Sequence, residues 1–214
     1  MSKSLADFRR IYSKGQLMEA EIPDDPLNLF QVWFEQMEKI KDLVEVNAMT
    51  ISTMGLDGFP KNRVVLLKEF GAEGFTFFTN YNSEKAEALK ANPHICLSFF
   101  WAELERQVII KGKAEKCSEE RSTEYFQSRP RGSQIGAWAS NQSREIASRE
   151  VLEESVRELE NKFVNKDIPK PEFWGGYLVR PVSIEFWQGR PNRLHDRILY
   201  TKENEQWLTK RLAP

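Results

Sequence analysis

The chain alternates between stretches with a helical period of apolar residues and stretches rich in β-branched and aromatic residues. The clearest helical stretch begins at Asp25-Pro26, an N-cap residue followed by proline at the first helical position. Its apolar residues recur every three or four positions, at Leu27, Phe30, Phe34 and Met37. This spacing predicts a helix that packs one face on the core.

From residue 48 the pattern becomes that of β-strands. Runs at residues 48–54, 63–70 and 75–81 are separated by turn sequences and predict a three-stranded meander. A short helix over residues 83–91 leads to further strands at residues 95–101 and 107–114. Consecutive strands with short connections predict antiparallel pairing in a barrel or sandwich.

The second half of the chain predicts helices and then strands. A helix over residues 118–127 stops near Arg129-Pro130, because the residue before a proline is disfavoured in a helix. Ser143 is expected to cap a long helix whose core stripe is Leu152, Val156, Leu159 and Phe163. The last predicted strands cover residues 174–179, 182–188, 197–201 and 206–212. With no repeat or linker, we predict one α+β domain over residues 21–214, preceded by a mobile N-terminal arm, residues 1–20.

Composition narrows the classes of partner. The 214 residues include 31 Lys and Arg against 32 Asp and Glu, a net charge of -1, so no global field attracts nucleic acid or an anionic membrane. No apolar run approaches the ~20 residues of a membrane span, and the N-terminus lacks the hydrophobic region of a signal peptide. We therefore expect a cytoplasmic protein. The two cysteines and two histidines form no metal-binding spacing, which predicts reduced thiols and no metal site.

Chemistry is concentrated in the segment Arg193-Leu194-His195-Asp196-Arg197. If the segment is extended, Arg193, His195 and Arg197 project from one face and form a cationic row with one titratable group. The alternative for these residues alone is an exposed strand with charges on its wet face. Neither GxGxxG after a strand nor GxxxxGK[ST] occurs, which argues against Rossmann and P-loop enzymes, and no serine or cysteine nucleophile with a neighbouring base is evident.

Further cations and hydroxyls suggest a phosphate site. Tyr125, Arg129 and Ser133 share one helical face, which Pro130 must bend into a pocket. Lys85 lies in the first turn of a short helix. Arg63 and Lys68 bracket an apolar strand; a straight strand would place them on opposite faces, so they share a ligand only through a bulge or a strand end. For each cation taken singly, a solvated surface charge is the alternative.

Long ordered motifs carry a resemblance to a known family. They are RVVLLK (63–68), FFTNYNSEKA (77–86), ERQVIIKGKAE (105–115), YFQSRPRGSQIGAWAS (125–140), FWGGY (173–177), EFWQG (185–189) and RLHDR (193–197). From about Phe8 to Pro214 the chain strongly resembles the pyridoxine/pyridoxamine 5′-phosphate oxidase family. The resemblance implies a split β-barrel homodimer with FMN at the subunit interface. It also implies oxidation of pyridoxamine 5′-phosphate and pyridoxine 5′-phosphate to pyridoxal 5′-phosphate, with O2 as acceptor and release of H2O2.

The resemblance also assigns site residues. Implied FMN contacts are Arg63, Val64, Val65, Leu66, Leu67, Lys68, Phe78, Thr79, Lys85, Gln107, Gln142, Ser143, Trp187 and Arg197. Implied substrate contacts are Lys68, Tyr125, Arg129, Ser133, Arg193, Leu194 and His195, with Arg9, Arg10, Ile11 and Tyr12 of the arm as a lid. Arg193, His195 and Arg197 are the implied catalytic residues.

Physical roles follow for these residues. Arg193 and His195 would orient the pyridine ring, and Arg197 would favour the negative charge of the reduced flavin. Two positions depart from the family pattern: Glu84 stands where relatives carry arginine, which puts one FMN phosphate contact in doubt, and Ile11 stands where an acidic residue can occur.

Two other functions stay open. A flavin split-barrel oxidoreductase with another substrate is disfavoured by the set Tyr125, Arg129 and Ser133 together with RLHDR. A non-catalytic carrier of FMN or pyridoxal 5′-phosphate is disfavoured by the intact Arg193, His195 and Arg197. Release of H2O2 on addition of pyridoxamine 5′-phosphate would exclude the carrier.

Overall fold

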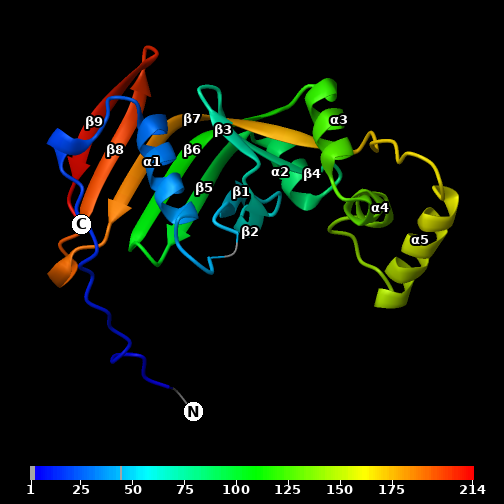
Figure 1. Ribbon diagram of the computed structural model, residues 1–214, viewed down its shortest axis with the longest axis horizontal. Helices are drawn as coiled ribbons and strands as arrows, with labels where there is room; N and C mark the ends of the chain where they lie inside the picture. Colours follow the sequence, from blue (N-terminus) through cyan, green and yellow to red (C-terminus); the bar gives the residue numbers. More distant parts are fainter. Residues whose placement is uncertain (1–2, 44) are drawn as a thin grey trace. The chain divides into compact units, whose positions relative to one another are not determined.

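One sheet contains all nine strands of the computed structural model, which describes residues 3–43 and 45–214 (Figure 1). The strand order is β2-β1-β5-β6-β7-β4-β3, with β8 paired to β7 and β9 paired to β8. The helices are η1 Glu19–Glu21, α1 Pro26–Glu38, α2 Glu84–Ala91, α3 Glu119–Ser128, α4 Arg131–Ala139, α5 Arg149–Lys162 and η2 Pro191–Arg193. The strands are β1 Ala48–Met54, β2 Pro60–Leu66, β3 Glu69–Gly71, β4 Gly74–Asn80, β5 His94–Trp101, β6 Arg106–Lys116, β7 Trp174–Gln188, β8 Asp196–Glu203 and β9 Gln206–Leu212.

The described chain divides into two compact units. Unit one consists of the described part of Met1–Thr50 with Cys96–Lys111 and Pro181–Pro214, and unit two consists of Ile51–Ile95 and Gly112–Arg180. The proposals that residues 21–214 form one domain and that residues 1–20 are mobile stay predictions. Among the described residues, no helix combines the length and apolarity that a bilayer crossing requires.

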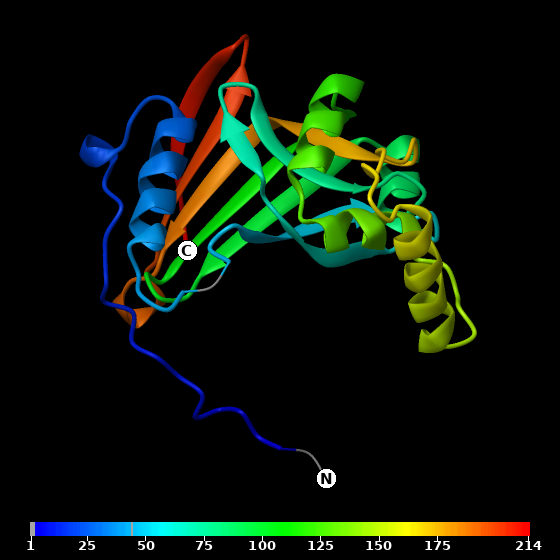
Figure 2. The ribbon, with the colours of Figure 1, turned by 45° about the vertical axis from the view of Figure 1, so that its right-hand side comes forward.

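Helix α1 lies beside strands of unit one (Figure 2), and its buried residues contribute to the core of that unit. The Asp25 side chain accepts a hydrogen bond from the Leu27 backbone N–H at 2.9 Å, which caps the helix as predicted. The ring of Phe30 lies 5.2 Å from that of Phe99 on β5, and Trp33 lies 5.1 Å from Phe186 on β7. Such edge-to-face pairs hold the helix on the sheet.

The antiparallel ladder β7-β8-β9 completes unit one. The register places Trp187 opposite Arg197, and Arg197 opposite Leu212. Ile198 and Tyr200 of β8 are fully buried, whereas most residues of β9 are exposed. Within β8, the buried Ile198 and Tyr200 alternate with half-buried neighbours, as expected for a strand with one face on the core.

In unit two, β4 pairs with the first half of β7 and with β3. Adjacent glycines in β7 permit close packing there, because a Cβ at Gly176 would lie 2.7 Å from Cys117 Sγ and 2.8 Å from Phe78. A Cβ at Gly175 would overlap the Tyr81 hydroxyl. Helices α3, α4 and α5 pack around a second apolar cluster, formed by Phe126, Ile135, Phe163, Ile168 and Trp174.

The prediction of a three-stranded meander was wrong. The predicted strand over residues 63–70 is broken after Leu66, and its end belongs to β3. β4 then pairs with β7, far away in sequence, rather than with β2. Strands predicted at residues 174–179 and 182–188 form the single strand β7.

The helical region also differs from the prediction. Helix α4 was not predicted separately; it begins directly after Pro130, which serves as its N-cap residue. The long helix starts at Arg149 with Ser148 as N-cap residue, whereas Ser143 has φ 70° and lies in a turn. Its apolar stripe is only partly core, since Phe163 is buried while Val156 and Leu159 are partly buried.

Candidate active site

A polar cavity of about 560 Å³ opens in unit two. Its volume lies in the range of small-molecule sites. It is lined by Arg63, Val64, Val65, Leu66, Lys68, Phe78, Thr79, Asn80, Lys85, Tyr125, Arg129, Pro130, Ser133, Gln142 and Trp174. The break after β2 brings the ends of the RVVLLK segment to this cavity, so Arg63 and Lys68 both line it. Asn80, Pro130 and Trp174 were not among the predicted site residues.

Lys85 is a nearly buried cation in this cavity. Its Nζ donates to Gln142 Oε1 at 2.7 Å, to Thr79 Oγ1 at 3.2 Å and to Ser83 Oγ at 3.3 Å, all neutral groups. Burial, and secondly the charge of Arg63, lowers the pKa of Lys85 to about 8. A buried ammonium without a carboxylate partner is costly, so an anionic ligand would stabilise it.

Arg63 extends the positive charge beside Lys85. Its Nη1 donates to Thr53 Oγ1 and to the Lys61 carbonyl oxygen, each at 2.8 Å. Burial lowers the pKa of this guanidinium, although it stays charged. The pair therefore concentrates positive charge that the described residues of the cavity do not neutralise.

Arg129 carries the clearest unsatisfied group. Its Nη1 is buried and has no hydrogen-bond partner in the described structure. The guanidinium lies 4.6 Å from the ring centre of Trp174, and burial lowers its pKa. Because buried donors are nearly always satisfied, the free Nη1 indicates a ligand with an acceptor oxygen.

Pro130 bends the chain between α3 and α4 and brings hydroxyls to this guanidinium. Arg129 is extended, with φ -73° and ψ 148°, so Tyr125 and Ser133 lie on different helices and still line one cavity. The amide of Gln134 fixes the bend by donating to the carbonyl oxygens of Phe126 and Arg129 at 3.1 and 3.2 Å. The predicted convergence of Tyr125, Arg129 and Ser133 is therefore observed, with two helices in place of one.

Flat aromatic rings form one wall of the cavity. Phe78 stacks on Tyr125 with ring centres 3.9 Å apart and on Trp174 at 5.6 Å. The hydroxyl of Tyr125 and the guanidinium of Arg129 thus lie beside an apolar wall. Such a combination suits a planar ring that carries a phosphate.

A smaller cavity of about 310 Å³ adjoins the Lys85 region. Its lining residues are Lys61, Asn62, Arg63, Glu84, Lys85 and Ser143. Glu84, the departure from the family pattern, pairs with Lys61, which also binds Asp57 at 3.2 Å. Lys61 was missed from sequence, although its position near Arg63 in the same strand would have been a signal.

Unit one contains a separate cavity of about 590 Å³. It is lined by Phe8, Arg9, Arg10, Ile11, Tyr12, Trp187, Arg190, Asn192, Arg193 and His195. The predicted lid residues of the arm and the predicted Arg193 and His195 are thus brought together. The expected extended geometry of Arg193 and His195 was wrong, because η2 ends at Arg193 with φ 63° and β8 begins only at Asp196.

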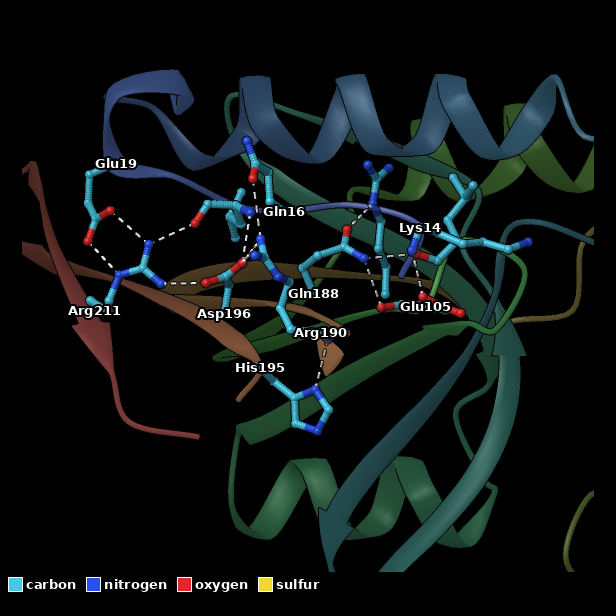
Figure 3. Close-up of polar contacts among 12 residues, drawn as sticks. Lys14, Gln16, Glu19, Glu105, Gln188, Arg190, His195, Asp196 and Arg211 are labelled. Atoms are coloured by element: carbon cyan, nitrogen blue, oxygen red, sulfur yellow. Dashed lines mark hydrogen bonds and ion pairs between the residues drawn. The ribbon is translucent and has the colours of Figure 1, made fainter. Parts of the chain in front are cut away.

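His195 is held by its neighbours in a defined orientation. The backbone N–H of Arg190 donates to its Nδ1 at 3.1 Å (Figure 3). Its ring lies 4.6 Å from Trp187 and 5.7 Å from Tyr12. Partial burial, and secondly the charge of Arg193, lowers the pKa of His195. The lowered pKa and the hydrogen bond from Arg190 both favour the neutral imidazole.

Arg197 has a different environment from Arg193. Its Nε donates to Glu185 Oε1 at 2.8 Å and its Nη1 to the Ala213 carbonyl oxygen at 2.9 Å. The Glu185 carboxylate raises the pKa of this guanidinium. Arg197 does not line the described cavity that contains Arg193 and His195.

Three other predicted site residues lie away from the described cavities. Leu67 is buried, with 3% exposure, and Leu194 is 69% exposed. Gln107 lies in β6 of unit one and lines none of these cavities. The roles of all predicted site residues stay predictions.

Comparison with known proteins identifies the class of protein to which this chain is similar. A family model described as pyridoxamine 5′-phosphate oxidase matches residues 36–163, and a second, described as the pyridoxine 5′-phosphate oxidase C-terminal dimerisation region, matches residues 174–214. The solved structure of PhzG from Burkholderia lata 383 has a TM-score of 0.86 at 26% identity and covers 92% of this chain and 98% of its own. A pyridoxamine 5′-phosphate oxidase-related, FMN-binding protein from Nostoc punctiforme has a TM-score of 0.70 at 16% identity, with 90% and 100% coverage. The chain thus has the split β-barrel fold of the pyridoxamine 5′-phosphate oxidase class, as predicted.

Full-length relatives narrow the class to a family. A pyridoxine/pyridoxamine 5′-phosphate oxidase from Flavobacterium johnsoniae is 60% identical over 98% of both chains, and one from Christiangramia forsetii is 56% identical over 100% of both. The chain belongs to the pyridoxamine 5′-phosphate oxidase family, whose cofactor is FMN. The predicted family, enzyme class and cofactor are confirmed.

Proposed function

We propose that the chain oxidises pyridoxamine 5′-phosphate and pyridoxine 5′-phosphate to pyridoxal 5′-phosphate. O2 is the final acceptor and leaves as H2O2; the amine substrate also consumes water and releases ammonia. The observation that carries the proposal is the pair of cations in one cavity, the nearly buried Lys85 and the half-buried Arg129 with its buried Nη1, neither of which meets a carboxylate among the described residues. Two cations in one site suit two phosphates, one on the cofactor and one on the substrate.

The residues of the unit-two cavity fit FMN on one side. Lys85 and Arg63 would hold its phosphate, with Thr79 and Gln142 positioning the Lys85 ammonium. FMN, when bound, supplies the hydride acceptor for the reaction. The protein contributes binding and orientation.

The other cation would select the substrate. Arg129 offers its free Nη1 to the substrate phosphate, with Tyr125, Ser133 and Lys68 lining the same cavity. A charge-assisted contact of this kind is stronger than a neutral hydrogen bond. Phosphorylated substrates would therefore be bound much more tightly than free vitamers.

Arg193 and His195 would orient the pyridine ring. Because Nδ1 of His195 accepts a hydrogen bond from Arg190, the neutral ring carries its proton on Nε2 and can donate to a substrate oxygen. The arm residue Tyr12 packs against His195 and would cover the bound ring, excluding water. Arg197 would place positive charge near the reduced flavin, as the resemblance implies.

We further propose that two copies assemble as a homodimer with FMN at the subunit interface, in the cytoplasm. The match of residues 174–214 to a dimerisation region supports the dimer. Sedimentation of the purified protein would test it, and a fully active monomer would refute it.

The function is tested by adding pyridoxamine 5′-phosphate to FMN-loaded protein and measuring pyridoxal 5′-phosphate and H2O2 together. We expect both products in equal amounts, and only slow turnover of unphosphorylated pyridoxamine. Flavin binding without either product would favour the carrier. The solved PhzG structure contains tetrahydrophenazine-1-carboxylic acid, so faster oxidation of such a carboxylate would favour the alternative oxidoreductase.

A further inference from the structure

Glu105 is a buried carboxylate that none of the proposed catalytic steps uses. Its side chain is 1% exposed, and it lies in the connection between β5 and β6 with φ 57°. Such a left-handed conformation is uncommon for a residue with a Cβ. The carboxylate is directed at the N-terminal arm (Figure 3).

The arm supplies the hydrogen-bond donors of this carboxylate. Oε2 accepts the backbone N–H groups of Ser13 and Lys14 at 2.8 and 2.9 Å, and Oε1 lies 3.5 Å from Arg10 Nη2. The Lys14 ammonium also donates to the Glu103 carbonyl oxygen at 2.6 Å. A buried carboxylate requires donors, so the arm and Glu105 stabilise each other.

The backbone of Glu105 fixes this anchor to the end of β7. Its carbonyl oxygen accepts the Gly189 N–H at 2.7 Å and Gln188 Nε2 at 3.3 Å. A Cβ at Gly189 would lie 2.9 Å from Tyr12 Cγ and 3.0 Å from Glu105 Cβ. The arm, the β5–β6 connection and Gly189 are therefore packed without space for another atom.

The anchored residues directly follow the segment that lines the Arg193 and His195 cavity. Ser13 adjoins Tyr12, whose ring lies 5.8 Å from Trp187 and 5.7 Å from His195. Fixing the Ser13 amide thus fixes the position of Tyr12 over the imidazole. Glu105 itself does not line the cavity.

We infer that Glu105 is a positioning residue, which holds the arm over the Arg193 and His195 cavity by accepting the Ser13 and Lys14 amides. It raises substrate affinity through the arm without touching substrate. This role in catalysis rests on the proposed function, whereas the anchoring of the arm does not.

The anchor is tested by hydrogen exchange of the FMN-loaded protein, followed by mass spectrometry on a peptide spanning residues 9–17. Glu105→Gln keeps the shape and loses the charge, and Glu105→Ala removes the acceptor. We expect exchange at Ser13 and Lys14 to accelerate about tenfold in the first variant and up to about a hundredfold in the second. Glu103→Gln is the matched control, because it removes an exposed carboxylate from the same connection and should leave exchange unchanged.

Kinetics then separate positioning from general stability. In Glu105→Gln we expect KM for pyridoxamine 5′-phosphate to rise about tenfold, with kcat and bound FMN changed less than about twofold. Unchanged exchange in Glu105→Ala would overturn the anchor. An unchanged KM, or equal loss of kcat and FMN in Glu105→Gln, would overturn the positioning role. If the unmodified protein oxidises no substrate, the proposed function fails, and the exchange data still decide the anchor.

Discussion

The backbone N–H of Arg190 donates to Nδ1 of His195, a residue that lines the unit-one cavity, so a ligand in that cavity has only the other ring nitrogen, Nε2, to bind. A backbone N–H can only donate, so Nδ1 is unprotonated while this bond exists. The ring is therefore a neutral donor through Nε2. A charged imidazole would have to break the bond with Arg190.

The first prediction concerns the tautomers of the two histidines. In His94, Nδ1 lies 2.8 Å from Asn92 Oδ1, an oxygen that also accepts the His94 backbone N–H, so its neutral ring should carry the proton on Nδ1. Nitrogen-15 NMR of the imidazoles at pH 7.5 should show one ring of each tautomer. His195 should also become protonated only below its ordinary pKa. Matching tautomers would contradict the assigned contacts.

The second prediction concerns the binding of the substrate phosphate by Arg129. Arg129→Ala should raise KM for pyridoxamine 5′-phosphate about ten- to a hundredfold, because a charge-assisted contact of about 1.5 to 3 kcal/mol is lost. Bound FMN should change little. Arg157→Ala removes an exposed guanidinium from α5 and serves as the control. An unchanged KM would assign Arg129 a structural role.

The third prediction is a pH dependence of FMN binding. Lys85 has a pKa of about 8 in the flavin-free protein, so its charge is present below pH 8 and is lost as the pH rises through that value. FMN affinity should fall by up to about tenfold per pH unit above 8. Equilibrium dialysis between pH 7 and 9.5 measures this. Lys85→Arg should abolish the dependence; a persistent decline in that variant would place its origin elsewhere.

The fourth prediction concerns Glu84, which departs from the family pattern. Its carboxylate pairs with Lys61 beside the Lys85 region and would repel a phosphate. Glu84→Gln should strengthen FMN binding about two- to fivefold at low salt, which is the scale of exposed charge pairs, and less at high salt. Glu87→Gln, on the same helix but paired with Arg144, is the control. Weaker FMN binding in Glu84→Gln would reverse the assigned role.

The fifth prediction separates Arg193 from Arg197. Arg193→Lys keeps the charge but loses the planar fork, so kcat/KM should fall while bound FMN stays nearly intact. Arg197→Lys should weaken FMN binding or shift the flavin midpoint potential. Flavin occupancy, potential and steady-state kinetics on both variants provide the comparison. Identical profiles would contradict the separate roles.

Elements specified by local signals could be predicted from sequence. The cap at Asp25-Pro26 fixes the start of α1, and the predicted bounds of β1 and β9 match the structure. Local patterns could not place the long helix, because Ser143 and Ser148 are both plausible caps and only the backbone geometry distinguishes them. The pairing of β4 with β7 joins residues about a hundred positions apart and leaves no local pattern.

The candidate site, like the fold, has features that could be predicted from the sequence and features that could not. Residue types and spacing predicted that Tyr125, Arg129 and Ser133 converge, since Pro130 forces a bend. The free Nη1 of Arg129 and the anchoring of the arm by Glu105 depend on which partners surround each group in space. Sequence periodicity contains no information on such partners.

The adjacent glycines of β7 also constrain which genetic changes the chain tolerates. Every single-base change that replaces glycine adds at least a Cβ, and at Gly176 that atom would press on Phe78 at 2.8 Å. Phe78 stacks on Tyr125 in the cavity wall, so the displacement would pass into the site. If random point variants are selected for activity, the survivors should therefore keep glycine at position 176, because even a conservative replacement would add a Cβ there.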